Sequence, residues 1–252
     1  MQCQTFLELP LARTGPTPGR RSGTALLRWG ALALAMLPAL AWSHGVAEGD
    51  ASFLASQEGF HFWPYFYLGA KHMVTGYDHL LFLAGVVFFL YRLKEIALYV
   101  TLFALGHSVT LLAGVWFDIP ANVYLVDAII GFSVIYKAFE NLGGFRTLGW
   151  QPNMRAAVAI FGLFHGLGLA TKLQELTLSP EGLLGNLLAF NAGVEVGQLL
   201  ALVFIVALMN LWRLTARFHG QAVLANGLIL ASGVVLLAYQ LTGYFASADA
   251  LL

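Results

Sequence analysis

The chain has 252 residues and a formal net charge of +0. Apolar residues make up 59% of it and charged residues only 10%, whereas a soluble domain carries about 25% charged residues. The neutral charge balance gives no support for a nucleic-acid partner. The one cysteine, Cys3, lies in a segment that we expect to be removed, which excludes disulfides, thiolate metal sites and cysteine nucleophiles from the mature protein. The composition predicts an all-α, polytopic helix bundle in a lipid bilayer.

Residues 1–43 have the pattern of a cleavable signal peptide. Basic residues, including Arg20 and Arg21, precede a short apolar run, and Ala41 and Ser43 supply the small residues of a cleavage site. We predict cleavage after Ser43. The new amine would then lie beside His44, which makes this imidazole a candidate terminal metal ligand. An uncleaved first span is the alternative.

Six apolar segments follow, and each approaches the length of about 20 residues that crosses a bilayer. Residues 44–74 are expected to form a periplasmic segment with an aromatic stretch at the membrane surface. Residues 75–245 are predicted to hold six transmembrane helices, and residues 246–252 a periplasmic tail. The predicted spans are residues 75–91, 96–117, 121–139, 156–173, 183–212 and 222–245. The first extends back to Trp63 if Gly76 breaks it.

Basic residues gather on one side of these spans. Only Lys71 and Lys172 fall on the other side among residues after the signal. The positive-inside rule places the basic side in the cytoplasm. We therefore predict a multi-pass protein of the bacterial inner membrane with its mature N-terminus in the periplasm. The residues on the basic side are Arg92, Lys94, Lys137, Arg146, Arg155, Arg213 and Arg217.

Polar side chains interrupt five of the predicted spans at a similar depth, nearer the periplasm. Such groups are costly against lipid, so we expect them to face one another or water. Imidazoles and carboxylates also suit divalent transition metals. The sequence therefore predicts an intramembrane cation site. Its candidate ligands are His72, Asp78, His79, His107, Asp127, His165, Asn191 and Glu195.

The spacing of His72, Asp78 and His79 leaves two arrangements open. On a continuous helix, the two histidines would lie about 10 Å apart. That is too far to share one metal ion at about 2.0–2.1 Å from each nitrogen. Either Gly76 breaks the helix and brings His72 back, or His72 binds the ion first and Asp78 and His79 bind it further inside.

These motifs resemble those of the HupE/UreJ family of nickel/cobalt permease-like membrane proteins. His72, Asp78 and His79 match its HX5DH signature, and residues 106–110, 164–168 and 190–195 are most similar to the second HupE/UreJ branch. Members of the better-known branch accompany hydrogenase or urease systems and are taken to move nickel. The resemblance implies that role for His72, Asp78 and His79. It also implies a metalloenzyme maturation system as a partner.

The preferred hypothesis is a secondary permease for Ni²⁺ or Co²⁺, with Zn²⁺ and copper ions as further candidates. A second hypothesis is an intramembrane zinc-dependent hydrolase, in which three histidines hold zinc and Asp127 or Glu195 activates water. No HExxH motif supports it. A third is a haem protein with His107 and His165 as axial ligands. A fourth is a metal-binding accessory or assembly subunit of a membrane complex.

Overall fold

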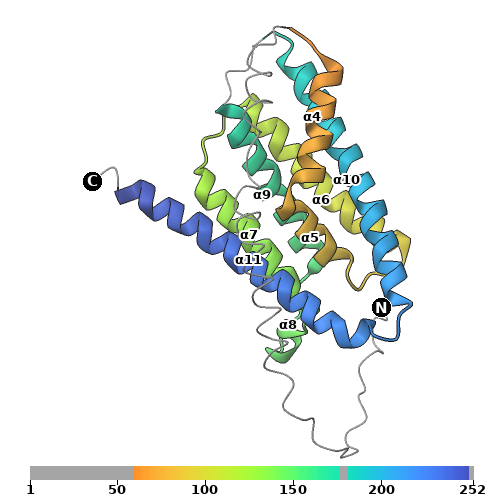
Figure 1. Cartoon of the computed structure of the whole chain (residues 1–252). Helices are drawn as coiled ribbons and strands as arrows, with labels where there is room; N and C mark the ends of the chain where they lie inside the picture. Colours follow the sequence, from red (N-terminus) through yellow and green to blue (C-terminus); the bar gives the residue numbers. More distant parts are fainter. Residues whose placement is uncertain (1–58, 176–180, 250–252) are drawn as a thin grey trace, which may run out of the picture. The chain divides into compact units, whose positions relative to one another are not determined.

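The computed structural model of the chain describes residues 59–175 and 181–249 (Figure 1). In these ranges the secondary structure consists of helices joined by short turns. The predicted signal peptide, its cleavage site and His44 lie outside the described residues.

Two helices form the region of the predicted first span. α4 is Phe62–Thr75 and α5 is Tyr77–Val87. Gly76, between them, has φ −73° and ψ 98°, an extended conformation that interrupts the helical path. Its N–H donates to the carbonyl of His72, and its carbonyl accepts from the N–H of Leu80. The structure thus confirms a break at Gly76.

The other predicted spans are helices with similar bounds. α6 is Leu93–Trp116 and α7 is Val123–Asn141, followed by the short α8, Gly144–Thr147. α9 is Met154–Gln174, α10 is Leu183–Arg213 and α11 is Phe218–Asp249. α11 therefore continues into the segment predicted as a tail from residue 246. This helix has no proline to stop it and ends on small, polar residues.

Asparagine side chains fix the starts of two of these helices. The side chain of Asn122 accepts a hydrogen bond from the N–H of Leu125 at the start of α7. Asn153 accepts from the N–H groups of Arg155 and Ala156 at the start of α9. An amide oxygen in this position satisfies N–H groups that have no partner within the helix.

Four of the described helices are long and apolar enough to cross a membrane, namely α6, α9, α10 and α11. α4 and α5 are shorter, and α7 carries Asp127, Lys137 and Glu140. These helices therefore agree with the predicted class, an all-α, multi-pass membrane protein. Membrane crossing by α7 and by α4 together with α5 stays a prediction, as does the orientation.

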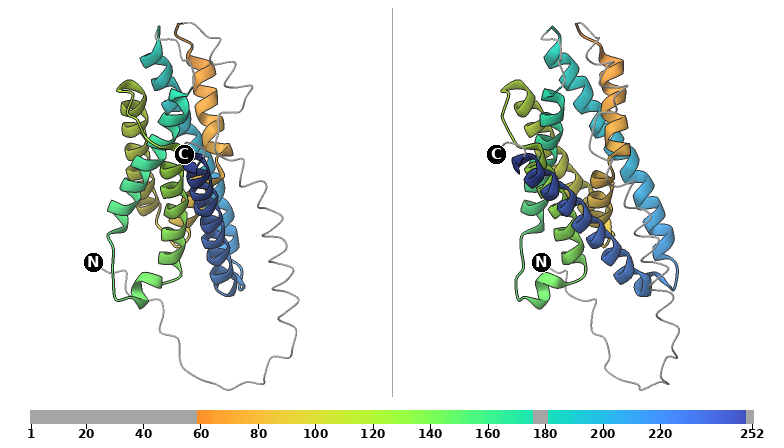
Figure 2. Two further views of the ribbon diagram at one scale, coloured as in Figure 1. Left: turned by 90° about the vertical axis from the view of Figure 1, so that its left-hand side faces the viewer. Right: turned by 60° about the vertical axis from the view of Figure 1, so that its left-hand side comes forward.

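Glycines allow three close helix pairs: α4 with α10, α6 with α9, and α7 with α11 (Figures 1 and 2). A Cβ on Gly69 would overlap the carbonyl of Phe190 on α10, and a Cβ on Gly166 would overlap the carbonyl of His107 on α6. A Cβ on Gly131 would lie 2.8 Å from the backbone nitrogen of Leu237. Small residues let helix backbones approach in this way in membranes.

The short helix α5 touches all three pairs. It packs against α4, α6, α7, α10 and α11, and Phe82 on α5 meets Phe161 on α9 edge to face. The first turn of α5 carries Asp78 and His79, and both side chains are buried. The arrangement therefore brings the predicted ligands on α5 to the centre of the helix pairs.

Candidate functional site

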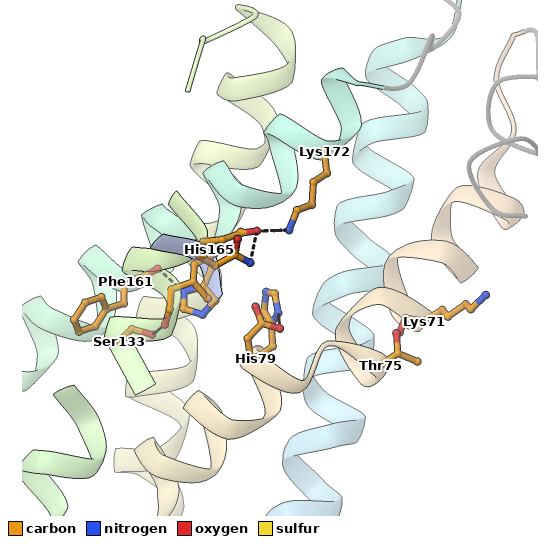
Figure 3. A network of polar contacts seen from close by, with 11 residues as sticks. Lys71, Thr75, His79, Ser133, Phe161, His165 and Lys172 are labelled. Carbon is orange, nitrogen blue, oxygen red and sulfur yellow. Dashed lines mark hydrogen bonds and ion pairs between the residues drawn. The ribbon is translucent and has the colours of Figure 1, made fainter. Parts of the chain in front are cut away.

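Four imidazole rings from four helices gather at the start of α5, and we call them the imidazole cluster. They belong to His72 on α4, His79 on α5, His107 on α6 and His165 on α9. His79 is central: its ring centroid lies 5.3 Å from that of His72, 5.8 Å from His107 and 5.0 Å from His165. His79, His107 and His165 are almost completely buried. Figure 3 shows His79 and His165 close together between the helices.

The break at Gly76 explains how His72 joins this cluster. The chain turns there, so the rings of His72 and His79 meet edge to face instead of lying two helical turns apart. Of the two arrangements left open by the sequence, the structure has the one in which Gly76 brings His72 back. A Cβ at Gly76 would lie 2.9 Å from Nδ1 of His79, which leaves little room for a side chain beside the cluster.

Asp78 supplies a buried negative charge next to the cluster. Its side chain is 1% exposed, and its Oδ1 lies 3.2 Å from Nδ1 of His79. This is a close electrostatic contact whose angles fall outside those of a hydrogen bond. Asp78 also lies in the first turn of α5, where the helix dipole favours a carboxylate.

Several buried polar atoms of the site have no hydrogen-bond partner among the residues that the structure describes. They include both ring nitrogens of His79 and of His107, and Oδ1 of Asn191. A buried polar atom without a partner costs about 1–3 kcal/mol, and such groups are rare in folded proteins. A cation bound among these atoms would accept one nitrogen lone pair from each neutral ring and a lone pair of the Asn191 oxygen, which would remove part of this cost.

The tautomer of His165 is set by its own helix. Nδ1 lies 2.8 Å from the carbonyl oxygen of Phe161. Because a carbonyl only accepts, Nδ1 of the neutral ring is the donor, and Nε2 carries the lone pair. A hydrogen bond of this kind orients the ring of a metal-binding histidine. His165 is therefore prepared to offer Nε2 to a ligand.

The spacing of the rings suits pairs of ligands. With a metal–nitrogen bond of about 2.0–2.1 Å, two imidazoles on one tetrahedral ion have centroids about 5 Å apart. The separations from His79, 5.0 to 5.8 Å, are close to that value. In the part of the chain that the structure describes, no three His, Cys, Asp or Glu side chains are arranged to hold a metal ion together. Ring rotations would be needed to add a third ligand.

The carboxylate of Asp127 forms an ion pair with Lys172. Its Oδ2 lies 3.0 Å from Nζ of Lys172, and its Oδ1 lies 3.3 Å from the same atom. Nε2 of Gln240 donates to Oδ2 at 3.4 Å. Gln240 was not among the site residues predicted from the sequence. An amide within a predicted transmembrane span was the available signal.

Asn191 and Glu195 lie on α10, at the edge of the site. Glu195 is exposed, whereas Asn191 is 8% exposed. Oε1 of Glu195 accepts hydrogen bonds from Nδ2 of Asn191 at 3.1 Å and from Oγ of Ser108 at 3.2 Å. Ser108 follows His107 on α6. These hydrogen bonds therefore link α6 and α10 next to His107.

Long apolar helices around buried imidazoles and carboxylates define a multi-pass membrane protein with a polar core. A family model described as HupE / UreJ protein matches residues 48–248. The chain therefore belongs to the HupE/UreJ family, which confirms the predicted resemblance. No curated protein and no solved structure matches the chain.

Proposed function

We propose that the protein is a secondary permease for a divalent transition-metal cation, with Ni²⁺ or Co²⁺ as the substrate. The observation that carries this proposal is the gathering of four imidazoles around His79, with Asp78 beside it. Neutral imidazole nitrogens suit these borderline metals, whereas hard cations prefer oxygen ligands. The polar groups are buried among helices long enough to span a bilayer, where ionisable residues mark ion pathways.

In this proposal, one ring nitrogen of His79 and one of His107 are the first ligands, because among the described residues these buried nitrogens have no hydrogen-bond partner. As the ion moves, Nε2 of His165 and the ring of His72 become its ligands, either in place of the first two rings or together with them. Asp78 balances part of the ion's charge. Binding by changing pairs of imidazoles suits transport, because a site must hold the ion weakly enough to release it.

Glu195 and Asn191 are proposed to lead the ion to the cluster from the periplasmic side. Glu195 is exposed on α10, and Asn191 is more buried and lies one helical turn nearer the start of this helix, which the predicted orientation places at the periplasm. The carboxylate would attract the cation, and the amide oxygen of Asn191 would bind it on the way to the cluster. The proposed setting is the bacterial inner membrane, where a metalloenzyme maturation system would use the imported metal.

A zinc-dependent hydrolase is less well supported. Catalytic zinc is usually held by three protein ligands in a fixed arrangement. No such triplet is arranged within residues 59–175 and 181–249. The proposed water-activating carboxylate of Asp127 is held by Lys172, and Glu195 is exposed at the edge of the site.

Metal accumulation in cells tests the proposal. Cells that express the wild type should accumulate radioactive nickel or cobalt above a vector control, and His79→Ala combined with His107→Ala should abolish the gain. His219→Ala is the matched control, because His219 is an exposed histidine. Equal accumulation by the double variant, at equal protein level in the membrane, would refute a permease that works through these residues. Stoichiometric bound zinc without transport would support the hydrolase instead.

A further inference from the structure

A buried ammonium group lies beside the imidazole cluster. Lys172 is 9% exposed, and its Nζ pairs with the carboxylate of Asp127, which is 2% exposed. The amide of Gln240, 5% exposed, completes the group. Three helices, α9, α7 and α11, thus contribute to one buried polar contact. An ion pair in such a place is expensive to desolvate.

The Asp127–Lys172 pair is near the cluster because of the geometry of α9. His165 and Lys172 are seven residues apart, so they lie on the same face, about 10 Å apart along the axis. A helical side chain extends over the turn that precedes it, which directs the ammonium of Lys172 toward His165, as Figure 3 shows. In addition, a Cβ at Gly168, one turn after His165, would lie 3.3 Å from Oδ1 of Asp127.

The charges of the buried groups are unequal. With both carboxylates ionised and the amine protonated, Asp78 and Asp127 contribute two negative charges and Lys172 one positive charge, so this buried set with neutral imidazoles has one net negative charge. A bound divalent cation reverses this to one net positive charge. Without the ammonium, the same cation would be neutralised completely. The positive charge of Lys172 therefore repels a cation bound in the imidazole cluster, because charges in the protein interior interact strongly over about 10 Å.

We propose that Lys172 is a tethered internal cation that lowers the affinity of the imidazole cluster for divalent metal ions and so favours their release. It does so by its charge and by keeping Asp127 occupied. This inference rests on the proposed permease function. It assigns Lys172 a role in setting affinity, with no direct contact to the transported ion.

A purely structural role for Lys172 makes different predictions. If the lysine only neutralises Asp127, then Lys172→Gln and Asp127→Asn both destabilise the protein, and neither tightens metal binding. If Lys172 tunes affinity, the two substitutions act in opposite directions on binding. The sign of the change separates these roles, even if both variants are less stable.

The test is equilibrium binding of radioactive nickel to the purified full-length protein in detergent, with thermal stability measured in parallel. Lys172→Gln should tighten binding at least about tenfold, and Asp127→Asn should weaken it at least about tenfold. The double variant should stay within about threefold of the wild type, because the net charge is restored. Lys172→Arg, which keeps the charge, should also bind like the wild type.

The outcomes distinguish a failure of the proposed permease function from a failure of the inference about Lys172. A wild type that binds no divalent metal overturns the proposed permease and this inference with it. A wild type that binds nickel, with Lys172→Gln unchanged or weaker, overturns the inference alone. If Lys172→Gln does not fold, the double variant is compared with Asp127→Asn. The double variant, which also lacks the ammonium, should then bind nickel at least about tenfold more tightly than Asp127→Asn. Equal or weaker binding by the double variant would overturn the inference.

Discussion

The rings of His79 and His165 lie with their centroids 5.0 Å apart and their planes at 70° to each other, across the contact between α5 and α9. His165 is oriented by the carbonyl of Phe161 on its own helix, whereas the ring nitrogens of His79 have no hydrogen-bond partner in residues 59–175 and 181–249. One ring is thus fixed and the other is held only by packing and by the charge of Asp78. In the proposed permease, His79 is therefore the ring that would turn from one neighbour to another.

The central position of His79 predicts a rank order among single substitutions. His79→Ala removes the ring that neighbours all three others, so it should weaken nickel binding at least about tenfold, the cost of one lost ligand interaction of about 1.4 kcal/mol or more. His72→Ala removes a partly buried ring at the edge and should cost less. Titration of the purified variants measures this. Equal effects of the two changes would show that His79 has no special role, and His219→Ala should bind like the wild type.

Gly76 offers a way to disturb the cluster without straining the backbone. Its φ of −73° and ψ of 98° are accessible to any residue. The added methyl of Gly76→Ala would nevertheless lie 2.9 Å from Nδ1 of His79 and 3.3 Å from Oδ1 of Asp78. We expect metal binding to fall about tenfold or more while the thermal stability in detergent changes by only a few degrees. A large loss of stability with unchanged binding would contradict this account of Gly76.

The helices themselves could be predicted because apolar runs of membrane-spanning length leave few alternatives. The cost of polar groups against lipid also correctly placed Asp78, His79, His107 and His165 in the interior. Local chain geometry was harder to predict. A glycine permits a break but does not require one, so the position of His72 stayed open until the path of the chain at Gly76 was known.

Features that depend on which helices pack together could not be predicted. Asn191, Glu195 and Gln198 share one helix face by their spacing, yet Glu195 is exposed while Gln198 donates to the carbonyl of Val100 on α6. The rotation of α10 about its axis, relative to the neighbouring helices, decides which of these side chains is exposed. The spacing of the residues along the chain does not reveal that rotation. The contact of Gln240 with Asp127 likewise requires α7 and α11 to be a pair.

The exposure of Glu195 predicts a change in substrate capture. Glu195→Gln removes the charge but keeps an oxygen that can accept from Asn191 and Ser108. In the uptake assay, the substrate concentration at half-maximal rate should rise several-fold, with a maximal rate near that of the wild type. Glu175→Gln, at an exposed glutamate after α9, is the control. A complete loss of uptake at saturating metal would instead make Glu195 a ligand of the inner site.

Gly166 connects the packing of the bundle to the position of a ligand. It lies against the carbonyl of His107, and an added methyl would overlap that oxygen and crowd Oγ1 of Thr110. Gly166→Ala should therefore force α6 and α9 apart, at a cost of about 1–3 kcal/mol for overpacking. In a protein of this size, that cost should lower the midpoint of thermal unfolding in detergent by about 2–12 °C. Gly227→Ala is the control, because nothing lies within 4 Å of its added methyl, and alanine favours the helix. Nickel binding should also weaken in Gly166→Ala, since the shift separates the helices that carry His107 and His165. If Gly166→Ala were as stable as Gly227→Ala, the close approach of α6 and α9 at this residue would be wrong.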